Sequence, residues 1–175
     1  MGAGFLEARN ALSGALEKER ISWVHPDNYH VTLRFLGDTG IGDINRIRKA
    51  LRDRVRLPAD MKVQLLQLGS FGSGRRPRVV WVGFEDKGLF EALRVEVDDA
   101  LVQCGFPPGD QPFWPHLTLG RIRSLQDNNR FYRVVEEMKD AFRGIVRPGR
   151  LVFFRSILGN RGPRYIPLEE ILPVY

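Results

Sequence analysis

Apolar residues recur at helical spacing in three stretches of the chain, and this pattern sets the first expectations about the fold. It predicts helices over residues 5–19, 43–56 and 87–104, and we expect a fourth helix over 128–142. Asp43 is expected to cap the second of these helices and Gly105 to end the third.

Other stretches alternate between apolar and polar residues or are rich in β-branched residues, which indicates strands. We expect strands over 30–36, 61–68, 78–84, near 144–147, 150–158 and 164–168. The segment "GSFGSGRRP", between the second and third of these strands, is expected to be a flexible basic loop. Helices and strands then follow each other in an order typical of an α+β protein with mostly antiparallel sheets. A length of 175 residues favours one domain, or two small lobes that share a core.

Two stretches of the chain, "NYHVTLRFLGD" and "WPHLTLGRIRS", contain the same tetrad of a histidine, an apolar residue, a threonine and a leucine. The first tetrad is His30 to Leu33 and the second is His116 to Leu119, and the chain has only three histidines. Side chains alternate between the two faces of a strand. Each tetrad therefore predicts a strand with a histidine beside a threonine on one face and two aliphatic side chains on the other.

A pair of imidazoles indicates acid-base chemistry. One neutral and one protonated histidine act together as general base and general acid, as in-line displacement at phosphorus requires, and threonine hydroxyls can hold the phosphate. Alternatives remain open, because a single strand histidine is more often structural. A Ser-His-Asp triad also stays open, although no G-x-S-x-G motif occurs. Two histidines are too few for a usual zinc site, and no H-E-x-x-H motif occurs. We therefore expect no metal.

The composition adds a charge preference. The chain has 27 Lys and Arg against 21 Asp and Glu, a net charge of +6, and most of the excess is arginine. A basic balance favours anionic partners, although on charge alone a solvated basic surface is the first explanation. Cys104 is the only cysteine, which excludes an internal disulfide and fits the reducing cytoplasm. We expect no membrane span and find no signal-peptide layout.

The two tetrads and their flanks resemble the two-histidine (2H) phosphoesterase superfamily. The stretches "WVHPDNYHVTLRFLGD" and "FWPHLTLGRIR" are similar to the two motif regions of the RNA 2′,3′-cyclic phosphodiesterases, also called 2′-5′ RNA ligases (LigT-like). The resemblance implies one bilobal pseudo-twofold domain over residues 1–175. In it, antiparallel sheets line a central cleft, helices lie outside, and each lobe contributes one tetrad strand.

The resemblance also implies an activity. The expected reaction opens a 2′,3′-cyclic phosphate, on an RNA end or a nucleotide, to a 2′-phosphate, with a weaker reversible 2′-5′ ligation. No metal or other cofactor is expected, and the resemblance implies a cytoplasmic monomer. Alternatives are a 2H enzyme for a small cyclic or non-RNA nucleotide, and a non-catalytic nucleotide- or RNA-binding module.

The resemblance assigns roles residue by residue. His30 corresponds to the acid and His116 to the base, although the two labels can be exchanged. The residues that match phosphate-binding positions are Thr32, Thr118 and Arg121, and Phe35 matches an aromatic residue that stacks on the terminal base.

Strict alternation, however, places Phe35 and Arg121 on the aliphatic side of their strands, and it places Arg34 on the His30 side. A bulge, twist or strand end is needed to bring Phe35 or Arg121 to the site. In addition, the chain begins at "MGAGFLEAR", so we expect the first strand of the family fold to be absent.

Overall fold

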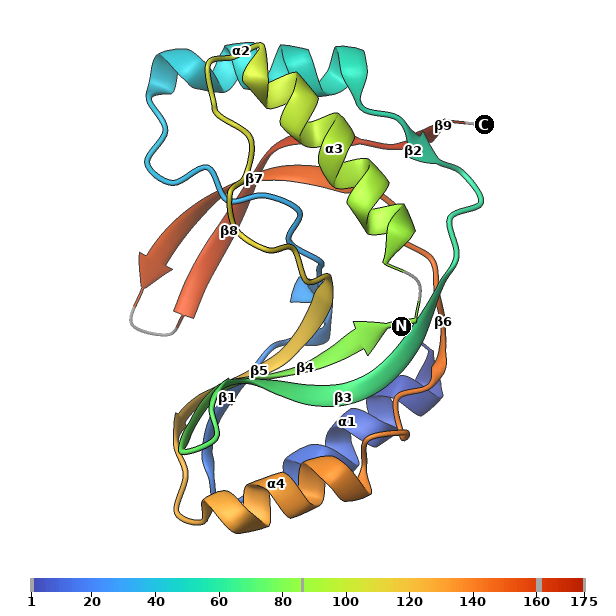
Figure 1. The fold of residues 1–175 in the computed structure, drawn as a ribbon, viewed down its shortest axis with the longest axis vertical. Coiled ribbons are helices and arrows are strands. Elements are labelled where there is room, and N and C mark those ends of the chain that lie inside the picture. Colours follow the sequence, from blue (N-terminus) through green and yellow to red (C-terminus); the bar gives the residue numbers. More distant parts are fainter. Residues whose placement is uncertain (1, 86, 160–161, 175) are drawn as a thin grey trace. The chain divides into compact units, whose positions relative to one another are not determined.

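The computed structural model describes residues 2–85, 87–159 and 162–174 and contains helices and mostly antiparallel strands (Figure 1). The helices are α1 (Ala3–Ala15), the short 3-10 helix η1 (Pro26–Asn28), α2 (Ile41–Arg54), α3 (Gly88–Val102) and α4 (Asn128–Glu137). The strands are β1 (Arg20–Trp23), β2 (Leu57–Pro58), β3 (Val63–Ser73), β4 (Arg76–Phe84), β5 (His116–Ser124), β6 (Gly144–Val146), β7 (Leu151–Gly159), β8 (Gly162–Ile171) and β9 (Pro173–Val174). Strands β2 and β9 pair in parallel.

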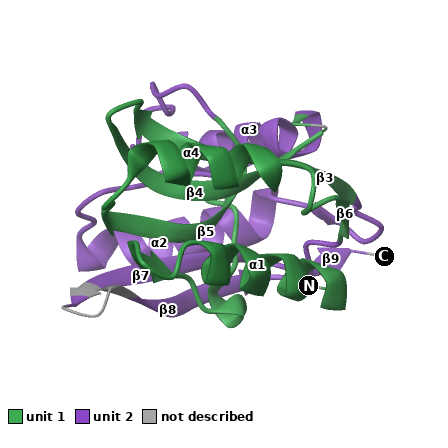
Figure 2. Cartoon of the chain, turned by 90° about the horizontal axis from the view of Figure 1, so that it is seen from below, with its two compact units in different colours: residues 1–32, 63–87, 114–146 green, residues 33–62, 88–113, 147–175 purple. Residues whose placement is uncertain are grey.

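The chain forms two compact units (Figure 2). Unit 1 comprises residues 1–32, 63–87 and 114–146, and unit 2 comprises residues 33–62, 88–113 and 147–175. The boundary passes through the first tetrad, between Thr32 and Leu33, so unit 1 holds most of the first tetrad and all of the second. The expectation of one tetrad strand per lobe stays a prediction. The organisation of residues 1–175 as a single domain stays a prediction.

Unit 1 is built on a five-stranded sheet with the order β1-β5-β4-β3-β6, in which every neighbouring pair is antiparallel. Helices α1 and α4 lie on one side of this sheet (Figures 1 and 2). Alternate strand residues are buried on the side that faces the helices, as hydrophobic alternation requires. The fully or almost fully buried apolar residues of this layer are Leu12, Leu16, Val80, Val82, Leu117, Leu119, Phe131 and Phe142.

Unit 2 has its own apolar core between α2 and α3. Ile47 and Leu51 of α2, with Val55 at its C-cap, pack with Val97 and Leu101 of α3 in one buried cluster. Leu33, Leu36 and residues of the β7–β8 hairpin cover this cluster. Packing of Leu33 and Leu36 against this core explains why the chain leaves unit 1 inside the first tetrad.

The strand predicted for residues 30–36 is wrong. These residues form no ladder, and the structure gives them no regular secondary structure. Alternation of apolar and polar side chains is not sufficient for a strand, because the backbone must also form hydrogen bonds with a neighbouring strand. Here the segment passes from one unit to the other, and its leucines pack on a helical core.

Two smaller predictions also fail. The expected basic loop "GSFGSGRRP" is not a loop, since β3 continues to Ser73 and β4 begins at Arg76, which leaves a tight hairpin turn. Gly40, rather than Asp43, is the N-cap of α2, and Asp43 lies in its first turn. Gly105 does follow α3 with a φ of 85°, a conformation that glycine adopts readily.

Candidate functional site

The second tetrad lies in β5, and its alternation is confirmed. Leu117 and Leu119 are buried on the helix side of the sheet, whereas His116 and Thr118 are partly exposed on the other side. We call this other side the site face. Paired residues of antiparallel strands point to the same face. The pairing of Thr118 with Trp81 therefore adds the indole of β4 to the site face.

A bulge in β5 brings Arg121 to the same face. The pairing of β4 with β5 skips Leu119: Trp81 pairs with Thr118, but Val80 pairs with Gly120 and Val79 with Arg121. One extra residue in a strand reverses the alternation beyond it. Val79 and Trp81 share a face, so Arg121 shares the face of Thr118 instead of the aliphatic side that strict alternation predicts. The positive charge of Arg121 is also among the causes that lower the pKa of His116.

Two aromatic rings flank His116 on the site face. Phe71 of β3 contacts the imidazole edge-on, with ring centroids 4.8 Å apart, and Trp81 lies next to Phe71 at the same centroid distance. The indole fits because glycines stand beside it: a Cβ added to Gly69 would lie 2.6 Å from the Trp81 ring. Phe71 was missed in the sequence because it belongs to the segment predicted as a loop.

Both tetrad histidines are held in the same way. Nδ1 of His30 lies 2.7 Å from the carbonyl oxygen of Asn28, and Nδ1 of His116 lies 2.7 Å from the carbonyl oxygen of Trp114. A carbonyl can only accept, so Nδ1 carries the hydrogen and donates it in each ring. The proton that titrates is then the one on Nε2. Each neutral ring therefore has Nε2 as its basic nitrogen, which is the arrangement that a general base or acid requires.

The surroundings of His116 favour its neutral form. Burial is the main cause that lowers the pKa of His116 below its usual value, and the positive charges of Arg121 and His30 lower it further. The hydrogen bond to the Trp114 carbonyl acts in the opposite direction. A histidine that stays neutral near pH 7 is suited to accept a proton.

His30 and Thr32 belong to unit 1 although they are not in a strand. They follow β1 and η1, whose Pro26 fixes the turn before the first tetrad. His30 is exposed and Thr32 is half-buried. The positive charge of His30 is among the causes that lower the pKa of His116.

The other two candidates near the first tetrad belong to unit 2. Phe35 is 81% exposed. Arg34 is mostly buried, lies 3.3 Å from the carboxylate of Asp98, and donates to the carbonyl oxygen of Pro107. Arg34, which strict alternation placed on the His30 side of its strand, therefore forms its contacts within unit 2.

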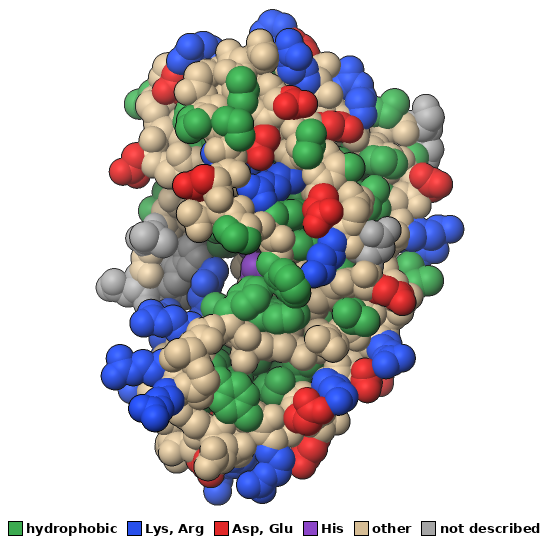
Figure 3. Space-filling view, in the orientation of Figure 1, with side chains coloured by type: hydrophobic (Ala, Val, Ile, Leu, Met, Phe, Trp, Pro, Cys, Tyr) green, Lys and Arg blue, Asp and Glu red, His purple; other side chains and the backbone are tan. Residues whose placement is uncertain are grey.

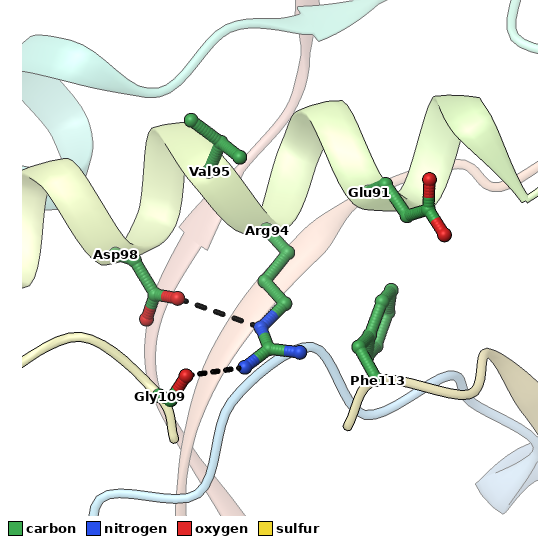
Figure 4. Close-up of a pocket in the computed structure, with 6 residues that line it drawn as sticks. All are labelled: Glu91, Arg94, Val95, Asp98, Gly109 and Phe113. Carbon is green, nitrogen blue, oxygen red and sulfur yellow. Dashed lines mark hydrogen bonds and ion pairs between the residues drawn. The ribbon is translucent and has the colours of Figure 1, made fainter. Parts of the chain in front are cut away.

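A separate hollow of about 360 Å³ lies in unit 2 beside α3 (Figure 4). The Arg94 guanidinium occupies its centre, where it pairs with Asp98, donates to the carbonyl oxygen of Gly109 and packs over Phe113. Because these groups already bond one another, the hollow holds a structural cluster. Neither tetrad contributes to it.

Within the described part of the chain, no group of three or more His, Cys, Asp or Glu side chains is placed to hold a metal ion. No helix in these residues is long and apolar enough to cross a membrane.

Comparison with known proteins gives consistent matches. The family model described as LigT like Phosphoesterase matches residues 2–81 and 85–165. An RNA 2′,3′-cyclic phosphodiesterase of Methanothermobacter thermautotrophicus is 32% identical over 150 residues, which cover 86% of this chain and 81% of that protein. Another of Aeropyrum pernix is 35% identical over 149 residues, with 85% and 84% covered.

Solved structures agree on the fold. TT0787 of Thermus thermophilus is similar with a TM-score of 0.74 and 27% identity, over 95% of this chain and 92% of that one. LigT of E. coli in its apo form has the same TM-score of 0.74 at 21% identity, over 100% and 94% of the two chains. These likenesses confirm the predicted α+β class and the expected 2H phosphoesterase fold.

Proposed function

Because the chain belongs to the LigT-like phosphoesterase family, we propose that it is an RNA 2′,3′-cyclic phosphodiesterase, which opens a terminal 2′,3′-cyclic phosphate to a 2′-phosphate. The observation that carries this proposal is the matched pair of histidines. In both, a backbone carbonyl fixes the hydrogen on Nδ1, so that Nε2 is the nitrogen that exchanges a proton.

In the proposed reaction, His116 is the base and His30 is the acid. Nε2 of His116 removes a proton from water, and the water oxygen forms a bond to phosphorus. The bond between phosphorus and O3′ breaks, and the protonated His30 gives its Nε2 proton to O3′. The lowered pKa of His116 supports this assignment, because it keeps that ring neutral before the reaction. A 5′-hydroxyl in place of water would give a 2′-5′ linkage by the same steps.

Thr32, Thr118 and Arg121 bind the phosphate in this proposal. The two hydroxyls donate hydrogen bonds to the non-bridging oxygens, and the guanidinium balances the negative charge that grows in the transition state. The β5 bulge supports the role of Arg121, since it turns this side chain to the face of Thr118. Exposed Phe35 stacks on the terminal base.

The proposed enzyme needs no metal and no cofactor, because its acid, base and positive charge all come from side chains. Its partners are RNA ends or nucleotides that carry a 2′,3′-cyclic phosphate. It acts as a monomer in the cytoplasm, where a lone buried thiol such as Cys104 stays reduced.

The test is hydrolysis of a nucleoside 2′,3′-cyclic phosphate in the presence of EDTA. We expect turnover by the unaltered protein and a loss of at least about 100-fold in His30→Ala and in His116→Ala, since each removes one partner in proton transfer. His25→Ala is the matched control, because the third histidine is 71% exposed in the turn at η1. Full activity of either tetrad variant would sink the assignment, and binding without turnover would favour a non-catalytic module.

A further inference from the structure

The sheet of unit 1 carries an unbalanced positive charge. The strands β1, β3, β4 and β5 contain no Asp or Glu. Their arginines are Arg20, Arg76, Arg78, Arg121 and Arg123. Figure 3 shows Lys and Arg side chains gathered over the end of the sheet where Figure 1 places β1 and the turn between β3 and β4. These strands thus carry positive charge with no acidic side chain among their own residues.

These arginines differ from the paired cations elsewhere in the chain. Arg48 and Arg52 of α2 share Glu169, and Arg143 pairs with Asp140. Among the described residues, no arginine of β1, β4 or β5 takes part in an ion pair. Arg76, Arg78 and Arg123 are all exposed. Their charge is therefore available to an anion from outside the chain.

Two of these arginines are placed on the site face, one by a hydrogen bond and one by the register. The pairing of β1 with β5 skips Arg123, but its guanidinium donates to the hydroxyl of Ser22, which pairs with Arg121. Arg76 pairs with Ser73, which shares the parity of Phe71 in β3.

Arg78 follows Arg76 by two residues in β4, at a further bulge. The pairing of β3 with β4 skips it, because Phe71 pairs with Val79 and Gly72 with Pro77. A bulge redirects the side chain of its extra residue, and this side chain is exposed. We name Arg76, Arg78 and Arg123 the arginine track.

We propose that the arginine track binds the phosphate backbone of single-stranded RNA upstream of the terminal phosphate held at His116. This inference rests on the proposed function and extends it from a nucleotide to a chain. Arg123 lies at the far end of β5 from His116, roughly 20 Å away at about 3.3 Å per residue. When the terminal nucleotide is bound at His116, the nucleotides before it are the ones that can contact the arginine track. The planar guanidinium fork suits phosphate oxygens, and rows of arginine along a groove bind single strands without reading their sequence.

The experiment separates a chain from a single nucleotide. One arm measures hydrolysis of a nucleoside 2′,3′-cyclic phosphate, which touches only the catalytic site. The other arm measures binding of an oligoribonucleotide that ends in a 2′-phosphate, at several NaCl concentrations, by fluorescence anisotropy. Each of Arg76→Gln, Arg78→Gln and Arg123→Gln is compared with Arg133→Gln, an equal loss of charge at an exposed position of α4 on the helix side of the sheet.

We expect each track variant to weaken binding of the oligoribonucleotide about 3- to 5-fold. The logarithm of the binding constant falls linearly with log [NaCl], and this slope should become less steep by about 0.7 for each phosphate contact removed. Hydrolysis of the nucleoside cyclic phosphate should be unchanged, and Arg133→Gln should resemble the unaltered protein in both arms.

The outcomes distinguish the two proposals. Track variants that bind the oligoribonucleotide with the affinity and salt slope of Arg133→Gln would overturn the track, even if the enzyme is active. Failure of the unaltered protein to open the nucleoside cyclic phosphate would overturn the proposed function. The binding arm would then still report on the track, since it uses an unreactive strand.

Discussion

At the scale of single residues, the environment of His116 is the feature with the clearest chemical effect. Phe71 shields one edge of the imidazole, and burial is the largest influence on its pKa. The sequence predicted the histidine and its neighbouring threonine from alternation and repetition alone. It could not predict Phe71, because the contact depends on how three strands are paired.

Phe71→Ala tests this shielding. Without the phenyl ring, water reaches His116 and the pKa of the imidazole rises toward about 6.5, its value in water. The acid limb of the kcat/KM profile reports the base of the free enzyme, so it should move to higher pH. The measurement is kcat/KM for a nucleoside 2′,3′-cyclic phosphate from pH 5 to 9. Phe154→Ala, which removes an aromatic contact in the β7–β8 hairpin, is the control; an unmoved acid limb in Phe71→Ala would contradict the shielding.

The same lowered pKa predicts sensitivity to acid. The folded state binds the His116 proton less readily than the unfolded state, where the pKa is about 6.5. The stability that neutral His116 contributes is therefore present above about pH 6.5 and is lost as the pH falls below it. Urea unfolding at pH 7.5 and 5.5 should show a smaller loss of free energy in His116→Gln than in the unaltered protein. Equal losses would show that His116 is not responsible.

At the scale of elements, bulges decide which side chains reach the site face. The sequence predicted most helices and strands, because their apolar periods are strong. It could not place the extra residue of β5, since a bulge is a property of two paired strands and not of one. It also predicted a strand at 30–36 from an alternation that tertiary packing overrides. Resemblance to the family suggested Arg121, and only the register explains how Arg121 comes to share the face of Thr118.

Gly69→Ala tests the packing of the β3–β4 pair. The added methyl would lie 2.6 Å from the Trp81 ring, which is closer than any ordinary contact. The buried indole must then shift, at a cost of about 1–3 kcal/mol in the free energy of unfolding. Denaturant unfolding measures this cost, with Gly144→Ala as the control, because β6 has open space at that position. A loss no larger than that of the control would mean that Trp81 yields easily.

At the scale of the whole molecule, the chain crosses between its two units next to both motif regions. One crossing lies between Thr32 and Leu33 and another between Phe113 and Trp114. In unit 2, Asp98 of α3 pairs with Arg34, just past the first crossing. It also pairs with Arg94, which donates to the carbonyl oxygens of Gly109 and Gln111, just before the second. One carboxylate thus helps to anchor both segments in unit 2.

Asp98→Asn tests this anchor. The side chains of Arg34, Arg94 and Asp98 are only 15–18% exposed. Loss of the negative charge leaves two poorly solvated guanidinium groups, and the free energy of unfolding should fall by roughly 3 kcal/mol. Asp53→Asn removes a charge from an exposed pair with Lys49 and should cost about 0.5 kcal/mol or less. Denaturant unfolding compares the two variants, and equal costs would show that the Asp98 cluster is not an anchor.

The backbone carbonyl oxygens that accept hydrogen bonds from His30 and His116 limit which substitutions can alter the two imidazoles. The residue two positions before each histidine supplies a main-chain oxygen, and its side chain takes no part in that bond. Asparagine therefore serves at position 28 and tryptophan at position 114. No change of side chain can delete either acceptor. The backbone conformation before each histidine thus fixes the tautomer of its imidazole. Substitutions at positions 28 and 114 leave that tautomer unchanged as long as the backbone conformation is kept.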